Sequence, residues 1–169
     1  SRSVLWFLLV PIKVTGCEHV NPKQSYVFVA NHQSFLDVFA VYGWLPNNFK
    51  WLMKKEIRKV PFVGTACKVA GHIFVNRSNP RAALQSMEYI KAELVDGIST
   101  VIFPEGTRSK NTSLNKFKET FAILSKELNV PVVPVVITGS ERAVYHNVKI
   151  PFPRFFAKIN VDVLKPIYP

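Results

Sequence analysis

Residues 31–37 (Asn-His-Gln-Ser-Phe-Leu-Asp) place a histidine and an aspartate five positions apart, directly after an apolar run at 26–30. On one continuous helix these two side chains would point about 140° apart, at ~100° per residue. They meet only if His32 lies in the turn before a helix and Asp37 lies in its first turn, with Ser34 as the N-cap. Asp37 then orients one imidazole nitrogen while the other faces a cleft, as a general base requires. The alternative without chemistry is a capping-box variant of Ser34 and Asp37, with His32 a bystander.

Residues 103–109 (Phe-Pro-Glu-Gly-Thr-Arg-Ser) follow another apolar run, at 100–103. Gly106 permits an unusual backbone angle, and the next three residues offer two hydroxyls and a guanidinium fork suited to phosphate. An ordinary surface turn rich in turn-forming residues is the alternative.

Two further segments do not indicate any chemistry by themselves. Residues 71–77 end a short apolar run with Arg77, which alone is typical of a solvated surface position. Residues 130–135 form an apolar run with prolines at 131 and 134, which restricts the segment to a strand start or an edge. Taken alone, that run indicates packing.

The elements that must position these segments alternate between apolar runs and helical patterns. Strands are expected at 12–15, 26–30, 73–75, 100–103, 132–137 and 156–163. Helices are expected at 80–95, with Asn79 as N-cap and Gly97 as the stop, and at 117–128. This alternation predicts an α/β fold, with a mixed, mostly parallel central sheet flanked by helices, in a single domain over residues 1–169. Ligands in such folds collect where strands end and helices begin, and 31–37 and 103–109 both follow strands.

Length and composition bound the class of protein. A chain of 169 residues can bury one large core without disulfides or metals. Its 48% hydrophobic and 20% charged residues exclude a disordered or fibrous chain. A net charge of +11 favours nucleic acid, anionic lipid or phosphorylated substrates. The two cysteines and four histidines have no metal-ligand spacing, so no metal site is expected.

Two apolar segments bear on membrane contact. Residues 4–10 are far short of the ~20 residues of a spanning helix. They are either a buried element or the end of a membrane-anchoring segment whose remnant is 1–12. Residues 49–60 carry apolar side chains at helical spacing among basic ones, which predicts a basic amphipathic helix. Such a helix is either an interfacial membrane element or a surface helix packed on the core.

The four polar segments, in this order, resemble the glycerolipid acyltransferase superfamily, specifically the 1-acyl-glycerol-3-phosphate (lysophosphatidic acid) acyltransferase family. Its blocks N-H-x-x-x-x-D, F-[IV]-[DN]-R, F-P-E-G-T-R-S and V-P-x-x-P-[VI] correspond to 31–37, 74–77, 103–109 and 130–135. The resemblance covers about residues 25–140. Its first and third blocks together are highly specific and outweigh the alternatives without chemistry.

The resemblance implies a role for each matching residue. His32 would take the proton from the acceptor hydroxyl, which attacks the donor thioester, and Asp37 would orient His32 and stabilise its cationic form without an acyl-enzyme. The implied substrate-binding residues are Arg77, Glu105, Gly106, Thr107, Arg108 and Ser109. Within this set Glu105 would fix Arg108 or a neighbouring backbone group. Pro134 resembles a donor-site or structural wall position.

The implied enzyme is a 1-acylglycerol-3-phosphate O-acyltransferase of phospholipid biosynthesis. It would move a fatty acyl group from acyl-CoA or acyl carrier protein to the sn-2 hydroxyl of lysophosphatidic acid, giving phosphatidic acid, without a cofactor. The expected location is an anionic membrane surface on the cytoplasmic face. The alternatives are an acyltransferase for another lysophospholipid or glycerol 3-phosphate, and a non-catalytic lipid-surface binding module. No nucleic acid is expected, because no RNP, helix-turn-helix or KH pattern occurs.

Two positions depart from the family pattern. The family usually has F-K-x-G after the third block, whereas Phe117-Lys118 continues here into Glu119-Thr120 without a glycine. Glu119 is expected to crowd or repel a ligand near the following helix. Asn76 stands where many members carry Asp, which keeps hydrogen bonding and removes a charge.

Overall fold

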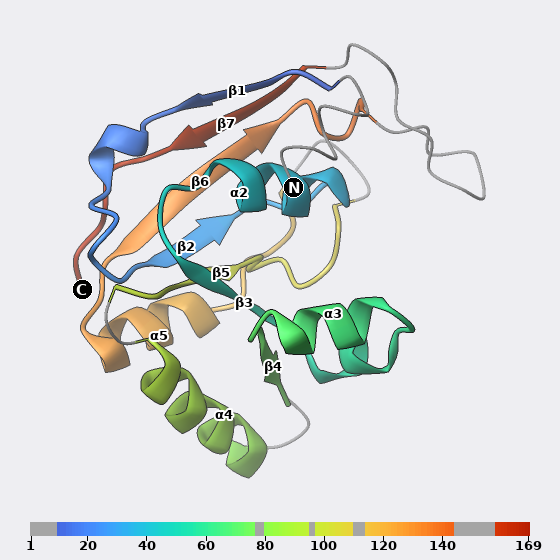
Figure 1. Ribbon diagram of the computed structural model, residues 1–169. Helices are drawn as coiled ribbons and strands as arrows, with labels where there is room; N and C mark the ends of the chain where they lie inside the picture. Colours follow the sequence, from blue (N-terminus) through green and yellow to red (C-terminus); the bar gives the residue numbers. More distant parts are fainter. Residues whose placement is uncertain (1–9, 77–79, 95–96, 110–113, 144–157) are drawn as a thin grey trace.

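A computed structural model describes residues 10–76, 80–94, 97–109, 114–143 and 158–169. Within these ranges one seven-stranded sheet has the order β1-β7-β6-β2-β5-β3-β4 (Figure 1). The strands are β1 (Ile12–Thr15), β2 (Val27–Ala30), β3 (Phe49–Lys54), β4 (Ile73–Val75), β5 (Ser99–Ile102), β6 (Val132–Thr138) and β7 (Ile159–Val163). Only β6 and β7 pair antiparallel among the described strands, and the other neighbours pair parallel.

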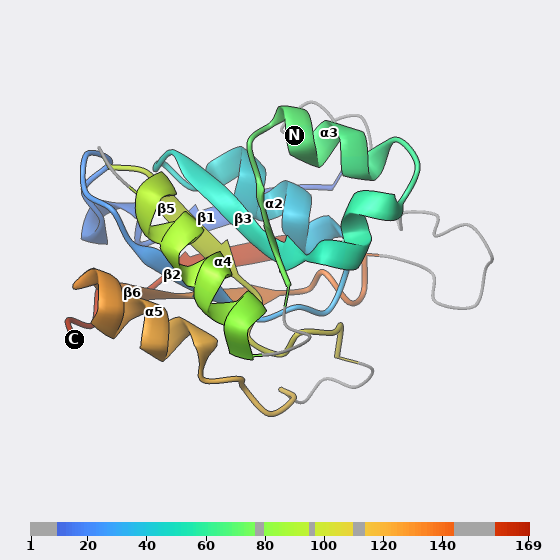
Figure 2. The ribbon, with the colours of Figure 1, turned by 90° about the horizontal axis from the view of Figure 1, so that it is seen from below.

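Helices cover both faces of the sheet. They are α2 (Leu36–Trp44), α3 (Val63–Val69), α4 (Pro80–Glu93) and α5 (Thr120–Leu128), with short 3₁₀ turns η1 (Cys17–His19) and η2 (Lys55–Lys59). Figures 1 and 2 show α2 over one face and α4 with α5 over the other. The layers therefore follow the α/β pattern in which a mostly parallel sheet is buried between helices.

The central strand β2 explains why two separate cores form. All four of its residues are buried, and successive side chains point to opposite faces of the sheet. Phe28 and Ala30 pack in the core under α2, whereas Val27 and Val29 pack in the core under α4 and α5. The continuous apolar run at this strand is thus the signature of burial on both sides.

The expected α/β class is confirmed. Each expected strand is present, with the expected bounds at 12–15 and 73–75 and with shifted bounds at the other four. The helix expected at 117–128 begins only at Thr120, because the Lys118 N–H donates to the Pro104 carbonyl at 3.0 Å in the preceding loop. Asn79 and residues 1–9 lie outside the described residues. No helix within the described ranges is long and apolar enough to span a bilayer.

The basic amphipathic helix expected at 49–60 is wrong. Residues 49–54 form β3, which pairs parallel with β5 on one side and with β4 on the other, and η2 follows. Trp51 and Leu52 are adjacent and both buried, on opposite faces of the sheet. A strand buried on both faces needs no alternation, so its apolar spacing also fits a helix.

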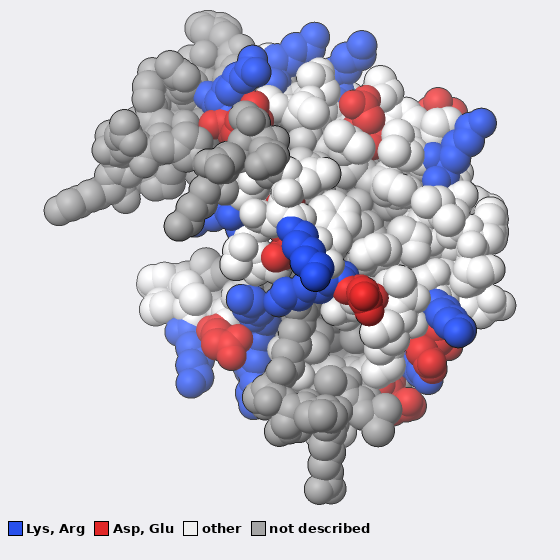
Figure 3. Space-filling model, turned by 180° about the vertical axis from the view of Figure 1, so that it is seen from behind, with Lys and Arg blue, Asp and Glu red and all other residues white. Residues whose placement is uncertain are grey.

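The described surface is rich in basic side chains, in keeping with the net charge of +11. Figure 3 shows the side of the molecule opposite to Figure 1. Basic side chains gather there toward the margin where α3 lies, with uncharged side chains among them. The charge is therefore unevenly distributed over this face.

Adjacent positions of α5 offer a test of the core. Leu124 is fully buried under the sheet, whereas its neighbour Ile123 is half exposed. Leu124→Ala should lower the free energy of unfolding by about 2–5 kcal/mol, because it removes packed methyl groups and leaves a cavity. Ile123→Ala should change it by at most about 0.5 kcal/mol. Urea denaturation followed by circular dichroism measures both, and equal losses would contradict the placement of α5.

Candidate active site

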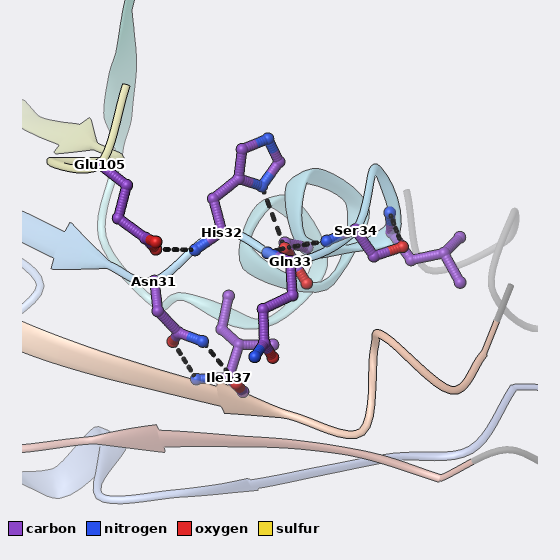
Figure 4. Close-up of polar contacts among 8 residues, drawn as sticks. Asn31, His32, Gln33, Ser34, Glu105 and Ile137 are labelled. Carbon is purple, nitrogen blue, oxygen red and sulfur yellow. Dashed lines mark hydrogen bonds and ion pairs between the residues drawn. The ribbon is translucent and has the colours of Figure 1, made fainter. Parts of the chain in front are cut away.

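The two strongest sequence segments meet at one edge of the sheet. Strands β2 and β5 are parallel neighbours, with Val29 opposite Ile102. Their carboxyl ends therefore coincide, and residues 31–37 and 103–109 leave the sheet side by side. Figure 4 shows His32 in the turn between β2 and α2, with Glu105 reaching it from the segment after β5.

His32 and Asp37 are in direct contact. Nδ1 of His32 lies 3.0 Å from Oδ2 of Asp37, whose side chain is fully buried. Because the carboxylate oxygen only accepts, Nδ1 carries the hydrogen and Nε2 is left to accept a proton. The geometry expected from the sequence, with His32 before the helix and Asp37 in its first turn, is present.

The same carboxylate oxygen also organises the turn. Oδ2 of Asp37 accepts the N–H groups of Gln33 at 2.7 Å and Ser34 at 2.8 Å. Phe35, rather than Ser34, occupies the position before the helix, but the Ser34 hydroxyl still accepts the Leu36 N–H at 3.3 Å. One half of the capping-box pattern, the bond from the Ser34 N–H to Asp37, therefore shares its oxygen atom with the His–Asp pair.

The third block fixes the backbone of His32 from both sides. Oε1 of the buried Glu105 accepts the His32 N–H at 2.9 Å, and Oε2 accepts the Asn115 N–H at 2.9 Å. The His32 carbonyl accepts the Ser109 N–H at 2.8 Å. Of the two roles expected for Glu105, the contacts match the fixing of neighbouring backbone groups.

Asn31 ties the His32 turn to a third strand, which sequence reasoning missed. Its amide donates to the Ile137 carbonyl at 2.8 Å, and its side-chain oxygen accepts the Ile137 N–H at 2.7 Å. The two bonds continue the pairing of β2 with β6 beyond the end of β2 (Figure 4). The available signal was an asparagine directly after a buried strand, where a side chain can replace lost backbone pairing.

An aromatic stack holds the imidazole ring from the side. The His32 ring lies on Phe103 with centroids 4.0 Å apart and planes 12° apart. Phe103 in turn stacks on Trp51 with centroids 5.0 Å apart. The ring of His32 is thus fixed both by its hydrogen bond to Asp37 and by this contact.

An apolar cavity of about 400 Å³ opens beside the stack. Its lining includes His32, Val38, Tyr42, Trp51, Met53, Lys54, Ile57, Ala66, Cys67, His72, Phe103 and Gly106. Most of these side chains are apolar, so the cavity suits an aliphatic or aromatic group next to an imidazole. Residues from five separated segments line this cavity, so no local sequence pattern indicates it.

His72 forms part of the cavity wall as a buried polar group. Its Nδ1 accepts the Trp51 N–H at 3.3 Å, and its ring lies edge-on to Tyr42. Burial, and next the nearby charge of Lys50, lower the pKa of His72 below its ordinary value. A neutral His72 keeps both the hydrogen bond to Trp51 and the apolar character of the wall.

The turn after Glu105 runs from the edge of the cavity, at Gly106, to the surface. Gly106 has a positive φ of 72°, and a Cβ placed there would lie 3.3 Å from Nζ of Lys118. Thr107 and Arg108 are exposed, beside the segment that holds His32. The close approach of Lys118, which sequence reasoning missed, adds a second cation next to this turn.

Three other expected positions differ in how they relate to this site. Arg77 lies outside the described residues. Glu119 is exposed at the position before α5. Pro134 lines a second apolar cavity of about 450 Å³, together with Asn31, Phe121 and others. That cavity lies on the α5 face of β6, so Pro134 is across the sheet from the cavity of His32.

Comparison with known proteins defines the class. The family model described as Acyltransferase matches residues 11–138, so the chain belongs to the Acyltransferase family. The resemblance found in the sequence is thereby confirmed at the level of the family.

Curated relatives share this part of the chain. It is 38% identical to a 1-acyl-sn-glycerol-3-phosphate acyltransferase of Limnanthes douglasii over 83% of this chain and 50% of the relative. It is 36% identical to the enzyme of that name from Cocos nucifera over 85% of this chain and 46% of the relative. With the human alpha enzyme the identity is 35%, over 77% and 46% of the two chains. The chain thus spans about half the length of these relatives.

A solved structure shares the fold. The crystal structure of the 1-acyl-sn-glycerophosphate (LPA) acyltransferase PlsC from Thermotoga maritima superimposes with a TM-score of 0.80. The match covers 99% of this chain and 65% of PlsC, at 24% sequence identity. At that identity the likeness supports the shared α/β architecture.

The buried His72 should make stability fall at acidic pH. Because its pKa is lower in the folded chain than the ordinary value near 6.5, the unfolded chain binds a proton at higher pH. Its contribution is complete above about pH 6.5 and is lost progressively as the pH falls below that value. Urea midpoints measured between about pH 7.5 and 5.5 should decline less steeply in His72→Gln than in the parent. Identical slopes would contradict a buried, neutral His72.

Proposed function

We propose that this chain is the catalytic domain of a lysophosphatidic acid acyltransferase. It moves an acyl group to the sn-2 hydroxyl of 1-acyl-glycerol-3-phosphate and forms phosphatidic acid. The observation that carries the proposal is the His32–Asp37 contact beside an apolar cavity, with the third block bonded to the backbone of His32. The names of relatives at 35–38% identity support the choice of substrate and product.

In the proposed reaction His32 acts as the general base. Nε2 removes the proton from the acceptor hydroxyl, whose oxygen attacks the thioester carbonyl of the donor. The carbon–sulfur bond then breaks, and the imidazolium returns its proton to the departing thiolate. Asp37 stabilises the imidazolium while it exists and keeps Nε2 facing the substrate. The substrate hydroxyl is the nucleophile, so no acyl-enzyme forms.

The acceptor phosphate is assigned to the turn after Glu105. Arg108 presents a guanidinium fork suited to phosphate, and Thr107 and Ser109 supply hydroxyls. The backbone N–H of Ser109 reaches the His32 carbonyl, so the turn that carries Arg108 is fixed relative to the base. Gly106 and Arg77 complete the proposed set. Glu105 holds the backbone and does not bind the anion.

The apolar cavity is assigned to the acyl chain of the donor. The cavity adjoins His32, and we assign the thioester to its mouth, where the attacking hydroxyl would reach it. The donor is acyl-CoA or acyl carrier protein, both of which suit a chain of net charge +11. Pro134 is assigned a structural part, because it lines the cavity on the other face. The proposed place of action is an anionic membrane surface on the cytoplasmic side.

Product analysis tests the proposal. The protein incubated with anionic vesicles, lysophosphatidic acid and either donor should form phosphatidic acid, detected by mass spectrometry. His32→Ala should abolish product, and Asp37→Asn should lower kcat by on the order of 10³–10⁴-fold, because the imidazole loses its orienting carboxylate.

The matched control is His19→Ala, since His19 lies in η1, after β1, and contacts the Val163 carbonyl at the end of β7. It should leave product formation unchanged. Turnover by His32→Ala near the parent rate would remove the general base. Product only from another lysolipid or from glycerol 3-phosphate would change the acceptor, and vesicle binding without any turnover would indicate a binding module.

Arg108 provides a separate test of phosphate recognition. Arg108→Ala should raise the KM for lysophosphatidic acid roughly 10- to 100-fold with little change in kcat, because a charged hydrogen bond to the bound substrate is lost. Arg142→Ala is the matched control, since its side chain is 81% exposed and pairs with Glu141. Steady-state kinetics measure both. A fall in kcat at unchanged KM would contradict ground-state binding of the phosphate.

A further inference from the structure

The segment of residues 54–70, which contains η2 and α3, exposes apolar side chains that a soluble surface rarely presents together. Phe62 is 91% exposed and Val69 is 83% exposed, and Val60 and Val63 are about half exposed. Figures 1 and 2 show η2 and α3 at the margin of the molecule, beyond β3 and β4. An exposed group of large apolar residues with polar neighbours marks a binding surface.

The backbone at Phe62 is held in a conformation that costs free energy. Phe62 has φ 61° and ψ −49°, and the Val63 N–H donates to the Pro61 carbonyl at 2.7 Å. These are the features of a γ-turn with positive φ, which is rare and strained for a residue with a side chain. The turn holds an aromatic ring in an exposed position, and strained backbone of this kind is typical of sites that bind a ligand or partner.

This segment is rigid enough to present the ring. Gly64 is buried where a Cβ would lie 2.2 Å from the Arg58 carbonyl oxygen, so α3 packs backbone to backbone on η2. The N–H of Gly64 also donates to the Val60 carbonyl at 2.9 Å. The ring of Phe62 therefore projects from a fixed platform.

Exposed basic side chains occur along the same segment as the exposed apolar ones. The exposed cations of the segment are Lys54, Lys55, Arg58, Lys59 and Lys68, against the single carboxylate of Glu56. Figure 3 shows this margin of the molecule with blue and white side chains together. An apolar tip in a segment rich in Lys and Arg is complementary to an anionic bilayer, whose headgroups attract the cations while the acyl region accepts the aromatic ring.

We propose that residues 54–70 form a docking segment that binds an anionic lipid bilayer and inserts Phe62 into it. The segment also supplies Ile57, Ala66 and Ala70 to the wall of the cavity that adjoins His32. Docking therefore brings the cavity wall against the lipid, which places the candidate active site at the surface where a lipid acceptor resides. The link to the acceptor rests on the proposed function, whereas the docking itself does not.

Vesicle flotation of the protein without substrate tests the docking segment. The lipids are phosphatidylcholine alone and phosphatidylcholine mixed with phosphatidylglycerol. Phe62→Ser should weaken partitioning into the mixed vesicles roughly 10- to 100-fold, because a buried aromatic ring is lost. Lys55→Gln/Arg58→Gln/Lys59→Gln should weaken it on the order of 100-fold at low salt.

Matched controls separate the segment from bulk properties of the protein. Ile123→Ser removes a half-exposed apolar side chain from α5, and Lys23→Gln/Lys126→Gln/Lys165→Gln removes three exposed charges elsewhere. Both should partition like the parent within about two-fold, since screening limits distant charges. Equal losses in the control triple, unchanged partitioning of Phe62→Ser, or no binding by the parent would each overturn the proposal.

Insertion of the side chain at position 62 into the bilayer can be measured separately, by fluorescence quenching. Tryptophan at position 62 (Phe62→Trp) should show additional fluorescence quenching by lipids brominated in the acyl chain, and Ile123→Trp should not. The absence of this quenching would overturn insertion of the ring. Phosphatidic acid formation with parent-like binding of the Phe62 variants would refute docking and leave the enzyme proposal intact. The expected binding pattern without any product would refute the enzyme proposal and leave docking intact.

Discussion

One buried carboxylate oxygen holds the candidate active site together. Oδ2 of Asp37 accepts hydrogen bonds from the His32 ring and from the N–H groups of Gln33 and Ser34. A buried charge is tolerated only when hydrogen bonds replace those it made to water. The chain between β2 and α2 is thereby confined to the one turn that delivers all three donors, so starting the helix and orienting the imidazole are a single interaction.

The rest of the site depends on the order of the strands in the sheet. Strands β6, β2 and β5 are neighbours, and each places a group on the turn that contains His32. From the end of β5 come the carboxylate of Glu105 and the N–H of Ser109, and from β6 comes the backbone of Ile137, bonded to Asn31. His32 is thus bonded through its ring, its backbone N–H and its carbonyl. A general base held in this way needs little reorganisation before it reacts.

Local geometry was predictable from the sequence, and contacts that depend on strand order were not. The His32–Asp37 contact follows from helix periodicity, and its proximity to residues 103–109 follows from the rule for α/β sheets. The partners of Glu105 and Asn31, and the cavity, arise because β2 lies between β5 and β6 and because β3 lies beside β5. Nothing local in 49–54 distinguishes a strand buried on both faces from a helix.

Because residues 49–54 form a strand and not part of a helix, this stretch lies closer to the candidate active site than the sequence predicts. A continuous amphipathic helix would lie as a separate layer between a lipid surface and the sheet. Instead β3 runs within the sheet and contributes Trp51 and Met53 to the cavity, and the chain then leaves through η2 and α3. The basic residues Lys54, Lys55, Arg58 and Lys59 therefore lie in the cavity wall or within a few positions of it. Under the proposed docking, contact with lipid and the shape of the cavity depend on the same stretch of chain, so a displacement of α3 at the bilayer would change the space beside His32.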